Sequence, residues 1–149
     1  MAANTKIRIA GFLKTSVADG PGVRSVLFFQ GCSKNCPGCH NAASRASDRG
    51  TEIEMDKLIG MLQTECKNRK LTISGGEPLE QASALLELTG SLKKMGFDLC
   101  VYTGEERENV PDDLLQNIHY IKTGRYIESM RTFSTPYVGS ANQNFITLR

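Results

Sequence analysis

The sequence has no run of lysine or arginine, and its 149 residues carry a formal net charge of only +2. Proteins that bind nucleic acid or an acidic membrane surface usually carry a basic patch, so neither is expected as a partner. No apolar stretch is longer than a strand and no signal peptide is recognisable, so no membrane span is predicted. Internal repeats and low-complexity linkers are also missing. We therefore expect a single domain over residues 1–149.

The five cysteines are not the even, regularly spaced set that indicates a disulfide framework. Three of them, Cys32, Cys36 and Cys39, fall within eight positions. Cys66 and Cys100 lie inside periodic apolar segments and are predicted to be buried in the core. This distribution favours a metal site over disulfides and indicates a reducing compartment, the cytoplasm.

The clustered cysteines lie in residues 31–40, which read Gly-Cys-Ser-Lys-Asn-Cys-Pro-Gly-Cys-His. Gly31, Pro37 and Gly38 interrupt any regular helix or strand, so the segment is predicted to be a loop. Three thiolates on a short loop can converge on one iron–sulfur cluster, which normally takes four cysteines. One iron would then be open to a ligand that is not protein. A zinc site or a structural cluster is the alternative.

Apolar patterns along the chain alternate between strand and helix. The predicted strands span residues 7–12, 23–30, 71–74, 97–102, 119–122 and 144–148, and the predicted helices span residues 55–67, 80–95 and 111–117. Because the strands read as apolar on both faces, we expect an α/β fold with a parallel sheet covered by helices. In such sheets ligands bind beyond the carboxyl ends of the strands. The turns that follow these ends are therefore expected to share one rim, and they are the cysteine loop and residues 75–77, 103–104 and 122–124.

The cysteine loop, combined with Gly-Gly-Glu-Pro at residues 75–78, resembles the radical S-adenosylmethionine (SAM) superfamily. The resemblance implies a truncated, open (βα) partial barrel. It also implies a [4Fe–4S] cluster held by Cys32, Cys36 and Cys39, with SAM chelating the fourth iron. The reduced cluster would cleave SAM to methionine and a 5′-deoxyadenosyl radical, which removes a hydrogen atom from a substrate. No protein side chain is implied as catalytic beyond the cluster and SAM.

Three N-terminal motifs resemble those of the activating enzymes of glycyl-radical proteins within this superfamily. The motifs span residues 19–24, 29–32 and 36–41, and residues 102–104, 122–128 and 139–143 are similar to the branch that activates anaerobic, class III ribonucleotide reductases. The resemblance implies a protein substrate, a glycyl-radical ribonucleotide reductase, which loses a hydrogen atom from the α-carbon of one glycine. Reduced flavodoxin or a similar protein is the implied electron donor.

The Gly-Gly-Glu turn is expected to bind the methionyl part of SAM. Gly75 and Gly76 have no Cβ and would let the backbone approach the cofactor closely. Carbonyl oxygens around them and the Glu77 carboxylate would accept hydrogen bonds from the SAM ammonium group. The alternative is a plain turn between a strand and a helix, with Glu77 in the first helical turn.

Five further residues are expected to bind the cofactor. Gly38, Cys39 and His40 end the cysteine loop, where many superfamily members carry an aromatic residue just before the third cysteine that touches the adenine. Gly38 cannot make this contact through a side chain, and His40 would make it instead through its backbone or ring. Thr103 is expected beside the methionyl or ribose part of SAM, and Lys122 near its carboxylate. The alternatives are a hydrogen bond of His40 within the loop, a strand-ending turn at Thr103 and a solvated lysine at Lys122.

The partner reductase is expected to contact residues at both ends of the chain. Asp19, Gly20 and Arg24 belong to the N-terminal signature, and Asn142 and Gln143 lie near the C-terminus. Asp19 would face the glycine-bearing loop of the partner or close its own loop through an Asx turn. The two amides would contact the reductase or order the C-terminal segment.

Two other classes of function remain open at this point. A non-catalytic iron–sulfur or zinc module would need a fourth ligand, for which Cys66, Cys100 and His40 are the candidates. Within the superfamily, the chain could instead activate a pyruvate formate-lyase type of partner or act on a small molecule, as 7-carboxy-7-deazaguanine synthase does. An open barrel of this length favours a bulky protein substrate over an enclosed small one.

Overall fold

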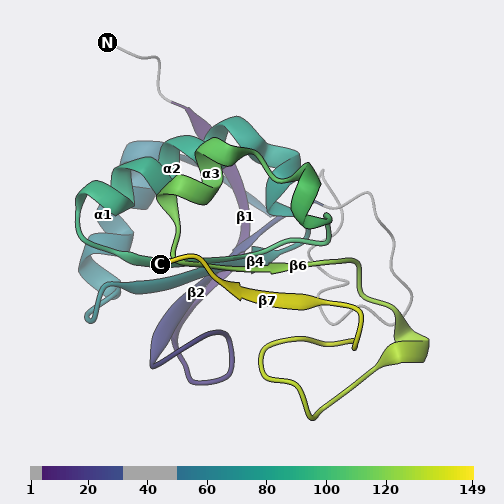
Figure 1. Ribbon diagram of the computed structural model, residues 1–149. Helices are drawn as coiled ribbons and strands as arrows, with labels where there is room; N and C mark the ends of the chain where they lie inside the picture. Colours follow the sequence, from purple (N-terminus) through teal and green to yellow (C-terminus); the bar gives the residue numbers. More distant parts are fainter. Residues whose placement is uncertain (1–4, 32–49) are drawn as a thin grey trace.

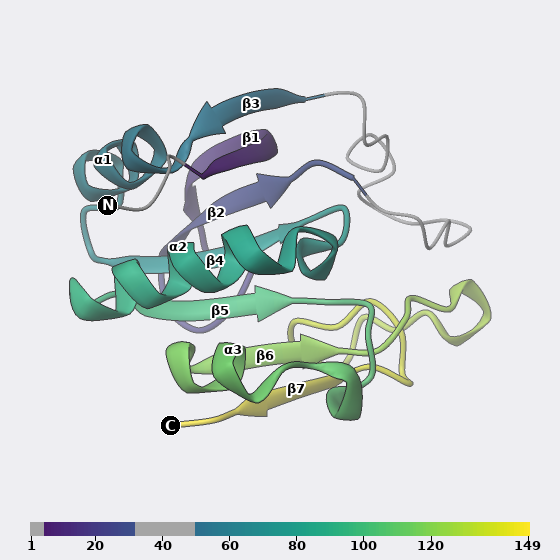
Figure 2. The same ribbon diagram turned by 90° about the horizontal axis from the view of Figure 1, so that it is seen from above.

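The computed structural model describes residues 5–31 and 50–149. The strands are β1 (Lys6–Ser16), β2 (Arg24–Phe29), β3 (Thr51–Glu54), β4 (Lys70–Gly75), β5 (Asp98–Tyr102), β6 (Tyr120–Thr123) and β7 (Asn144–Thr147). The α-helices are α1 (Met55–Glu65), α2 (Ala82–Lys94) and α3 (Asp112–Asn117), and the 3₁₀ turns are η2 (Pro78–Gln81), η3 (Arg107–Asn109) and η4 (Glu128–Met130). The strands form one sheet in the order β3-β1-β2-β4-β5-β6-β7, with the helices on one of its faces (Figures 1 and 2).

The sheet is parallel in its centre and antiparallel at both edges. Strands β2, β4, β5 and β6 run in the same direction. Strand β1 runs antiparallel to β2 and β3, and β7 runs antiparallel to β6. The α/β class is therefore confirmed, whereas the expectation of a wholly parallel sheet is wrong at the edges. The short connection at residues 17–23 is the reason at one edge, because a parallel pair needs a much longer crossover.

Strand β3 was not predicted from the sequence. Its four residues, Thr-Glu-Ile-Glu, contain a single apolar side chain and so carry little strand signal. The strand forms because it pairs with residues Lys6 to Ile9 of β1. The other predicted elements are present with shifted ends, and the helix predicted at 80–95 is divided into η2 and α2.

The two faces of the sheet carry different side chains because successive residues of a strand point to opposite faces. Toward the helices, the central strands contribute apolar side chains to the core, and these are Leu27, Phe29, Leu71, Ile73, Leu99, Val101 and Ile121. The residues between them are mixed in character: Val26, Phe28, Cys100 and Tyr102 are apolar or aromatic, and Thr72, Ser74 and Lys122 are polar. The expectation that the strands are apolar on both faces therefore holds only in part for the second face, which we call the open face.

Helix α2 shows how the covered face is built. Leu85, Leu88 and Leu92 recur at helical spacing and are fully buried against the sheet. Gly96, two residues beyond the helix, has a φ of +83°, the left-handed conformation that commonly ends a helix. The amphipathic pattern alone therefore places this helix on the sheet.

The open face is overlaid by two irregular segments instead of helices (Figure 1). One is the β1–β2 connection at residues 17–23, and the other is residues 124–143 between β6 and β7. Within the described residues, no helix has both the length and the apolar character that crossing a membrane requires.

Candidate functional site

The turn after β4 lies against the end of β2, at the carboxyl rim of the parallel strands. The Gly76 amide donates to the Phe29 carbonyl oxygen (2.9 Å), and the Glu77 amide donates to the Gly31 carbonyl oxygen (2.7 Å). Gly31 immediately precedes the cysteine loop, so that loop begins beside the Gly-Gly-Glu turn. Five predicted site residues lie outside the described residues, and they are Cys32, Cys36, Gly38, Cys39 and His40.

Gly75 is required by the packing of this rim. Its φ is +109°, and a Cβ atom here would lie 2.3 Å from the Phe29 carbonyl oxygen and 2.4 Å from the Phe29 nitrogen. Backbone atoms of a central strand cannot move aside, so no other residue fits this position. The close approach of Gly75 to SAM stays a prediction, since the fold itself already demands a glycine.

The Glu77 side chain connects the turns after β4 and β5. It is buried, and its Oε2 atom accepts hydrogen bonds from Thr103 Oγ1 (2.7 Å) and from the Leu79 amide (3.0 Å). Its Oε1 atom accepts from the Gly104 amide (2.7 Å). A carboxylate has about four acceptor positions, and three of them are filled by these contacts. This geometry favours the reading in which Glu77 orders the turn, and the contact with the SAM ammonium group stays a prediction.

The turns after β5 and β6 are joined to the same rim by backbone hydrogen bonds. The Thr103 amide donates to the Lys122 carbonyl oxygen, and the Gly124 amide donates to the Glu105 carbonyl oxygen, both at 2.9 Å. The Thr103 hydroxyl, besides donating to Glu77, accepts from the Glu105 amide (3.0 Å). The structure therefore brings the three later turns together, with the start of the cysteine loop beside them.

A cavity of about 500 Å³ opens next to this rim on the open face. The strands contribute Phe28, Ser74, Tyr102 and Lys122 to its lining, and the β1–β2 connection contributes Ala18 and Asp19. Most of the remaining lining comes from residues 131–139. Its volume is in the range of small-ligand sites in proteins. The cavity therefore offers room for a cofactor portion or a short peptide segment beside the rim.

Tyr102 and Lys122 form the polar wall of the cavity. The Lys122 Nζ atom lies 4.1 Å from the centroid of the Tyr102 ring, a cation–π contact. The Tyr102 hydroxyl is buried and has no hydrogen-bond partner within the described residues. Burial, reinforced by nearby Cys100 and Asp19, raises the pKa of Tyr102 well above its ordinary value, so the hydroxyl remains protonated.

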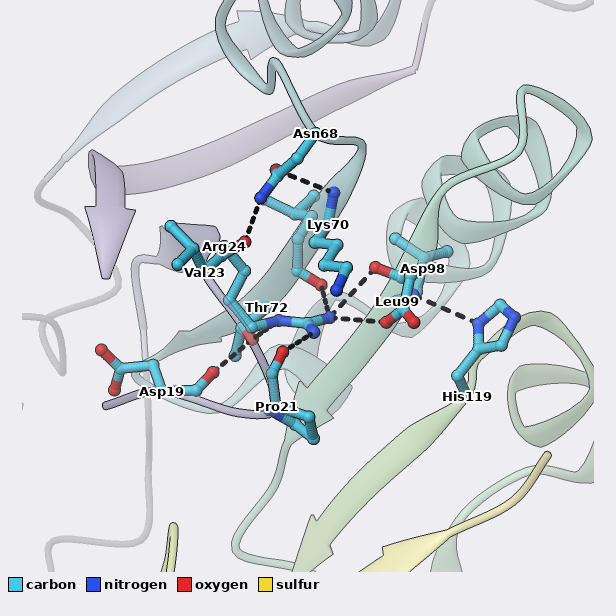
Figure 3. A network of polar contacts seen from close by, with 11 residues as sticks. Asp19, Pro21, Val23, Arg24, Asn68, Lys70, Thr72, Asp98, Leu99 and His119 are labelled. Atoms are coloured by element: carbon cyan, nitrogen blue, oxygen red, sulfur yellow. Dashed lines mark hydrogen bonds and ion pairs between the residues drawn. The ribbon is translucent and has the colours of Figure 1, made fainter. Parts of the chain in front are cut away.

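At the amino ends of the parallel strands, a buried arginine holds the β1–β2 connection against the sheet (Figure 3). Arg24 donates through Nε to Thr72 Oγ1 (2.8 Å) and through one terminal nitrogen to the Pro21 carbonyl oxygen (2.7 Å). Its other terminal nitrogen pairs with the Asp98 carboxylate (2.9 Å). Thr72 Oγ1 in turn donates to the Asp19 carbonyl oxygen (2.5 Å). The network fixes the backbone of Asp19 at the edge of the cavity.

The expectation that Arg24 contacts a partner is corrected by this burial. Its side chain is 0% exposed, and its guanidinium is occupied by the network. Gly20, with a φ of +117°, lies where a Cβ atom would be 3.1 Å from Arg24 Cδ, so both residues shape the loop itself. Asp19 remains a candidate contact because it lines the cavity, although its carboxylate also accepts from Ser16 Oγ (2.6 Å).

Asn142 and Gln143 order the segment between β6 and β7. The Gln143 side chain accepts from the Gly139 amide (2.8 Å) and donates to the Gly124 carbonyl oxygen (2.9 Å). The Asn142 amide group donates to the Arg125 carbonyl oxygen (2.8 Å). These contacts support the reading in which the two amides order the chain, and a contact with the reductase stays a prediction.

Comparison with known proteins now identifies the family. Residues 18–146 match the family described as a 4Fe-4S single cluster domain. The chain is 34% identical over 138 residues to an anaerobic ribonucleoside-triphosphate reductase-activating protein of Vibrio cholerae, covering 85% of this chain and 89% of that protein. The chain belongs to the 4Fe-4S single cluster domain family.

Two further proteins that are similar to this chain indicate its class within the family. The protein of the same name in Escherichia coli is 28% identical over 143 residues, which is 89% of this chain and 93% of that protein. The pyruvate formate-lyase 1-activating enzyme of Escherichia coli is 32% identical over 117 residues, which is 73% of this chain but only 48% of that enzyme. Together these relatives confirm the radical SAM activating enzymes as the class, with a [4Fe–4S] cluster and SAM as cofactors.

The family membership removes the alternative of a non-catalytic zinc or iron–sulfur module. Cys66 and Cys100, two of its three candidate fourth ligands, are buried free thiols, as predicted, and the third, His40, lies outside the described residues. Burial raises the pKa of both, that of Cys100 to about 12. Cys66 lies just before β4 begins, at the amino ends of the parallel strands, whereas Gly31 lies at their carboxyl ends. Within residues 5–31 and 50–149, no group of three His, Cys, Asp or Glu side chains is arranged to hold a metal ion.

Sequence reasoning missed several residues of the site. Thr72 and Asp98 complete the network that holds Asp19, and Ser74 and Tyr102 line the cavity. A signal for three of them was present, because residues 72, 74 and 102 interrupt otherwise apolar strands at alternating positions. No pattern pointed to Asp98, whose role depends on the neighbouring strand.

Proposed function

We propose that this protein activates an anaerobic ribonucleotide reductase by generating a glycyl radical on it, through reductive cleavage of SAM at a [4Fe–4S] cluster. The observation that carries the proposal is the match to reductase-activating proteins over nearly their full length, 89% of the Vibrio cholerae protein. The chain spans about half of the pyruvate formate-lyase activating enzyme that it matches, which makes that type of partner the second candidate.

The fold that goes with this function is a truncated, open partial barrel of the radical SAM type. Four parallel strands with helices on a single face support it, as do the rim and the cavity at the uncovered side. Antiparallel strands at both edges leave the sheet unclosed. The active site would therefore face a side that a large protein can reach.

The residues of the rim fit the two cofactors. Cys32, Cys36 and Cys39 supply three thiolates, which suits a cluster with one iron left for SAM. The hydrogen bond from the Glu77 amide to Gly31 holds the start of that loop at the rim. When bound, the cluster and SAM supply the one-electron chemistry that removes a hydrogen atom from the substrate.

The chain's own side chains orient the cofactor and the substrate. Thr103 and the Gly104 amide fix the Glu77 carboxylate, so the Gly-Gly-Glu turn is held in one conformation for the methionyl part of SAM. Lys122 places a positive charge in the cavity beside the rim, where the SAM carboxylate would lie. Asp19 also lines the cavity, beside the expected path of the reductase's glycine segment.

The reaction is placed in the cytoplasm, with reduced flavodoxin or a similar protein as the electron donor. Two observations support a reducing compartment. Cys66 and Cys100 are free thiols, and the three other cysteines have the spacing of cluster ligands.

Electron paramagnetic resonance tests the proposal directly. The anaerobically reconstituted protein should hold about four irons per chain and release 5′-deoxyadenosine when it is reduced with SAM. Mixed with an anaerobic ribonucleotide reductase, it should produce a glycyl-radical doublet, and mixed with pyruvate formate-lyase it should not. Cys36→Ala should lose iron and SAM cleavage, whereas Cys66→Ala should keep full metal content. An iron-loaded protein that never cleaves SAM under strong reductant contradicts the proposal.

A further inference from the structure

The Tyr102 hydroxyl is a buried donor for which the described residues supply no hydrogen-bond acceptor. Tyr102 is only 8% exposed, and burial raises its pKa, so the hydroxyl keeps its proton and can donate. Buried polar groups in folded proteins are almost always hydrogen-bonded, because a missing partner destabilises the fold. Two other buried side-chain oxygens lack a partner among the described residues, those of Thr123 and Asn142, but neither residue lines the cavity on the open face. Tyr102 does line it, so its hydroxyl points to an acceptor that a bound molecule supplies.

The hydroxyl lies on the side of the cavity that faces the β1–β2 connection. Besides burial, which is the main cause, three nearby groups raise its pKa, namely Cys100, Asp19 and Tyr137. Cys100 is two residues nearer to the amino end of β5, whereas Thr103 and the rim follow Tyr102. Asp19 and Tyr137 line the cavity from the two segments that overlie the open face. The hydroxyl is therefore directed into the cavity and away from the rim, where the cofactor is expected.

The charges around the cavity favour different ligand groups in its two parts. The Lys122 Nζ atom lies 4.1 Å from the centroid of the Tyr102 ring, so an anionic group is favoured beside that ring. The Asp19 carboxylate lies on the side of the hydroxyl, where it would repel a second negative charge. The carboxylate of SAM therefore suits the part of the cavity beside Lys122, whereas the acceptor for the Tyr102 hydroxyl should be neutral.

The substrate of the proposed reaction offers such an acceptor. Glycine has no side chain, so an enzyme that acts on one glycine of a protein must recognise that residue through its backbone groups. Each backbone carbonyl oxygen is neutral and accepts hydrogen bonds. The cavity wall next to Tyr102 is aromatic or small, with Phe28 and Ser74 in register across β2 and β4. Such a surface accommodates a glycine segment, and a single well-placed donor fixes the position of that segment.

We propose that the Tyr102 hydroxyl donates a hydrogen bond to a backbone carbonyl oxygen of the reductase segment that carries the substrate glycine. The inference rests on the proposed function and adds a substrate-binding residue to it. The hydroxyl keeps its proton and holds the segment in the cavity while the hydrogen atom is removed from the glycine. Because the hydroxyl has its partner only in the complex, the destabilisation that the unpaired hydroxyl causes in the free protein disappears on binding.

Tyr102→Phe tests the proposal in the reconstituted enzyme, because it removes the hydroxyl and keeps the ring. The reductase concentration that gives half-maximal glycyl-radical formation should rise about tenfold, since a buried carbonyl oxygen of the substrate is left without a partner. The glycyl radical formed per 5′-deoxyadenosine released should also fall, because the glycine is held less accurately. The SAM concentration that gives half-maximal release of 5′-deoxyadenosine should change by a smaller factor than the reductase concentration.

Tyr120→Phe is the matched control. Tyr120 lies on the neighbouring strand β6, where it pairs with Cys100, and it does not line the cavity. The substitution removes the same atom from the same face of the sheet, so this variant should activate the reductase as the unsubstituted protein does. If Tyr102→Phe and Tyr120→Phe are indistinguishable while the unsubstituted protein forms the glycyl radical, the role of Tyr102 is refuted and the proposed function stands.

Two measurements exclude other partners of the hydroxyl. If Tyr102→Phe shifts the SAM concentration as much as the reductase concentration, or more, the hydroxyl serves the cofactor and the proposal is overturned. The unfolding temperature of the reconstituted variant without reductase should equal or exceed that of the unsubstituted protein. A lower unfolding temperature would show that the hydroxyl is satisfied within the chain and would also overturn the proposal. Absence of SAM cleavage in the unsubstituted protein would instead contradict the proposed function, and this inference with it.

Discussion

The two faces of this sheet are stabilised by different interactions. The covered face is an apolar layer in which α2 packs Leu85, Leu88 and Leu92 against the strands. The open face has hydrogen bonds, an ion pair and a cavity in place of that layer, and Arg24 and Thr72 belong to its hydrogen-bond network. The comparison teaches that the same strands perform two tasks, one side supplying the stability of the fold and the other side positioning the loops of the site.

Substitution at the carboxyl rim of the parallel strands, which belongs to both faces, should cause the largest loss of stability. Gly75→Ala places a methyl group 2.3 Å from the Phe29 carbonyl oxygen, at a φ of +109°. Since only backbone surrounds it, we expect a loss of about 4 kcal/mol or more in the free energy of unfolding. Chemical denaturation followed by circular dichroism measures this loss. Gly60→Ala, where a Cβ atom would meet nothing within 4 Å, should be neutral or stabilising.

On the covered face, substitution should change stability without changing the reaction of the folded enzyme. Leu88→Ala removes a fully buried side chain of α2 and should cost about 2–5 kcal/mol of unfolding free energy. The glycyl radical formed per 5′-deoxyadenosine released, measured at low temperature where the variant is folded, should stay the same. A fall in that ratio would show that the two faces are not separate in function.

On the open face, a smaller change in stability should accompany a change in the reaction. Thr72→Val removes the hydroxyl that joins Arg24 to the Asp19 carbonyl oxygen and should cost about 1–3 kcal/mol. Because Asp19 then loses its anchor, we expect a severalfold fall in glycyl radical per 5′-deoxyadenosine. Thr89→Val is the control, since this buried hydroxyl lies on the covered face, where it donates within α2 and accepts from Asn117 of α3. Equal ratios for the two variants would contradict a positioning role for the network.

The effect that is smallest at neutral pH, where it vanishes, concerns a thiol on the open face. The pKa of Cys100 rises from 9.0 to about 12, chiefly because the thiol is buried. Between these two values the unfolded chain loses the proton and the folded chain keeps it, so stability falls as pH rises, by up to about 1.4 kcal/mol per pH unit. Comparing the unfolding free energies of the unsubstituted protein and Cys100→Ala from pH 8 to 11 isolates this slope. Parallel curves would contradict the shift.

Sequence reasoning succeeded where a single segment determines the outcome. The central strands and α2 follow from continuous apolar runs and helical spacing, and the order of strand ends places the Gly-Gly-Glu turn beside Gly31. It failed where the structure of a segment depends on another segment that is distant in the sequence. Strand β3 depends on pairing with β1, and the burial of Arg24 depends on Asp98 of β5, which lies 74 positions further along the chain.

The candidate site shows the same division. The turns that carry Glu77 and Thr103 were expected to share one rim, but the hydrogen bond between the two side chains could not be predicted, because it depends on the exact relative position of the two turns. Conversely, Gly75 was explained by a cofactor, whereas the contact with Phe29 already requires it. The presence of a residue in a motif therefore does not show whether the cofactor or the packing of the fold requires that residue.

The reversed direction of β7 sets a limit on how this architecture can grow. A further strand–helix unit beside β6 would need the position that β7 occupies through four residue pairs, from Tyr120↔Thr147 to Thr123↔Asn144. Lengthening the chain at this edge therefore cannot enclose the site unless β7 is first displaced. At the other edge, β3 already occupies the free side of β1. The strand order thus leaves the sheet unclosed at both of its edges.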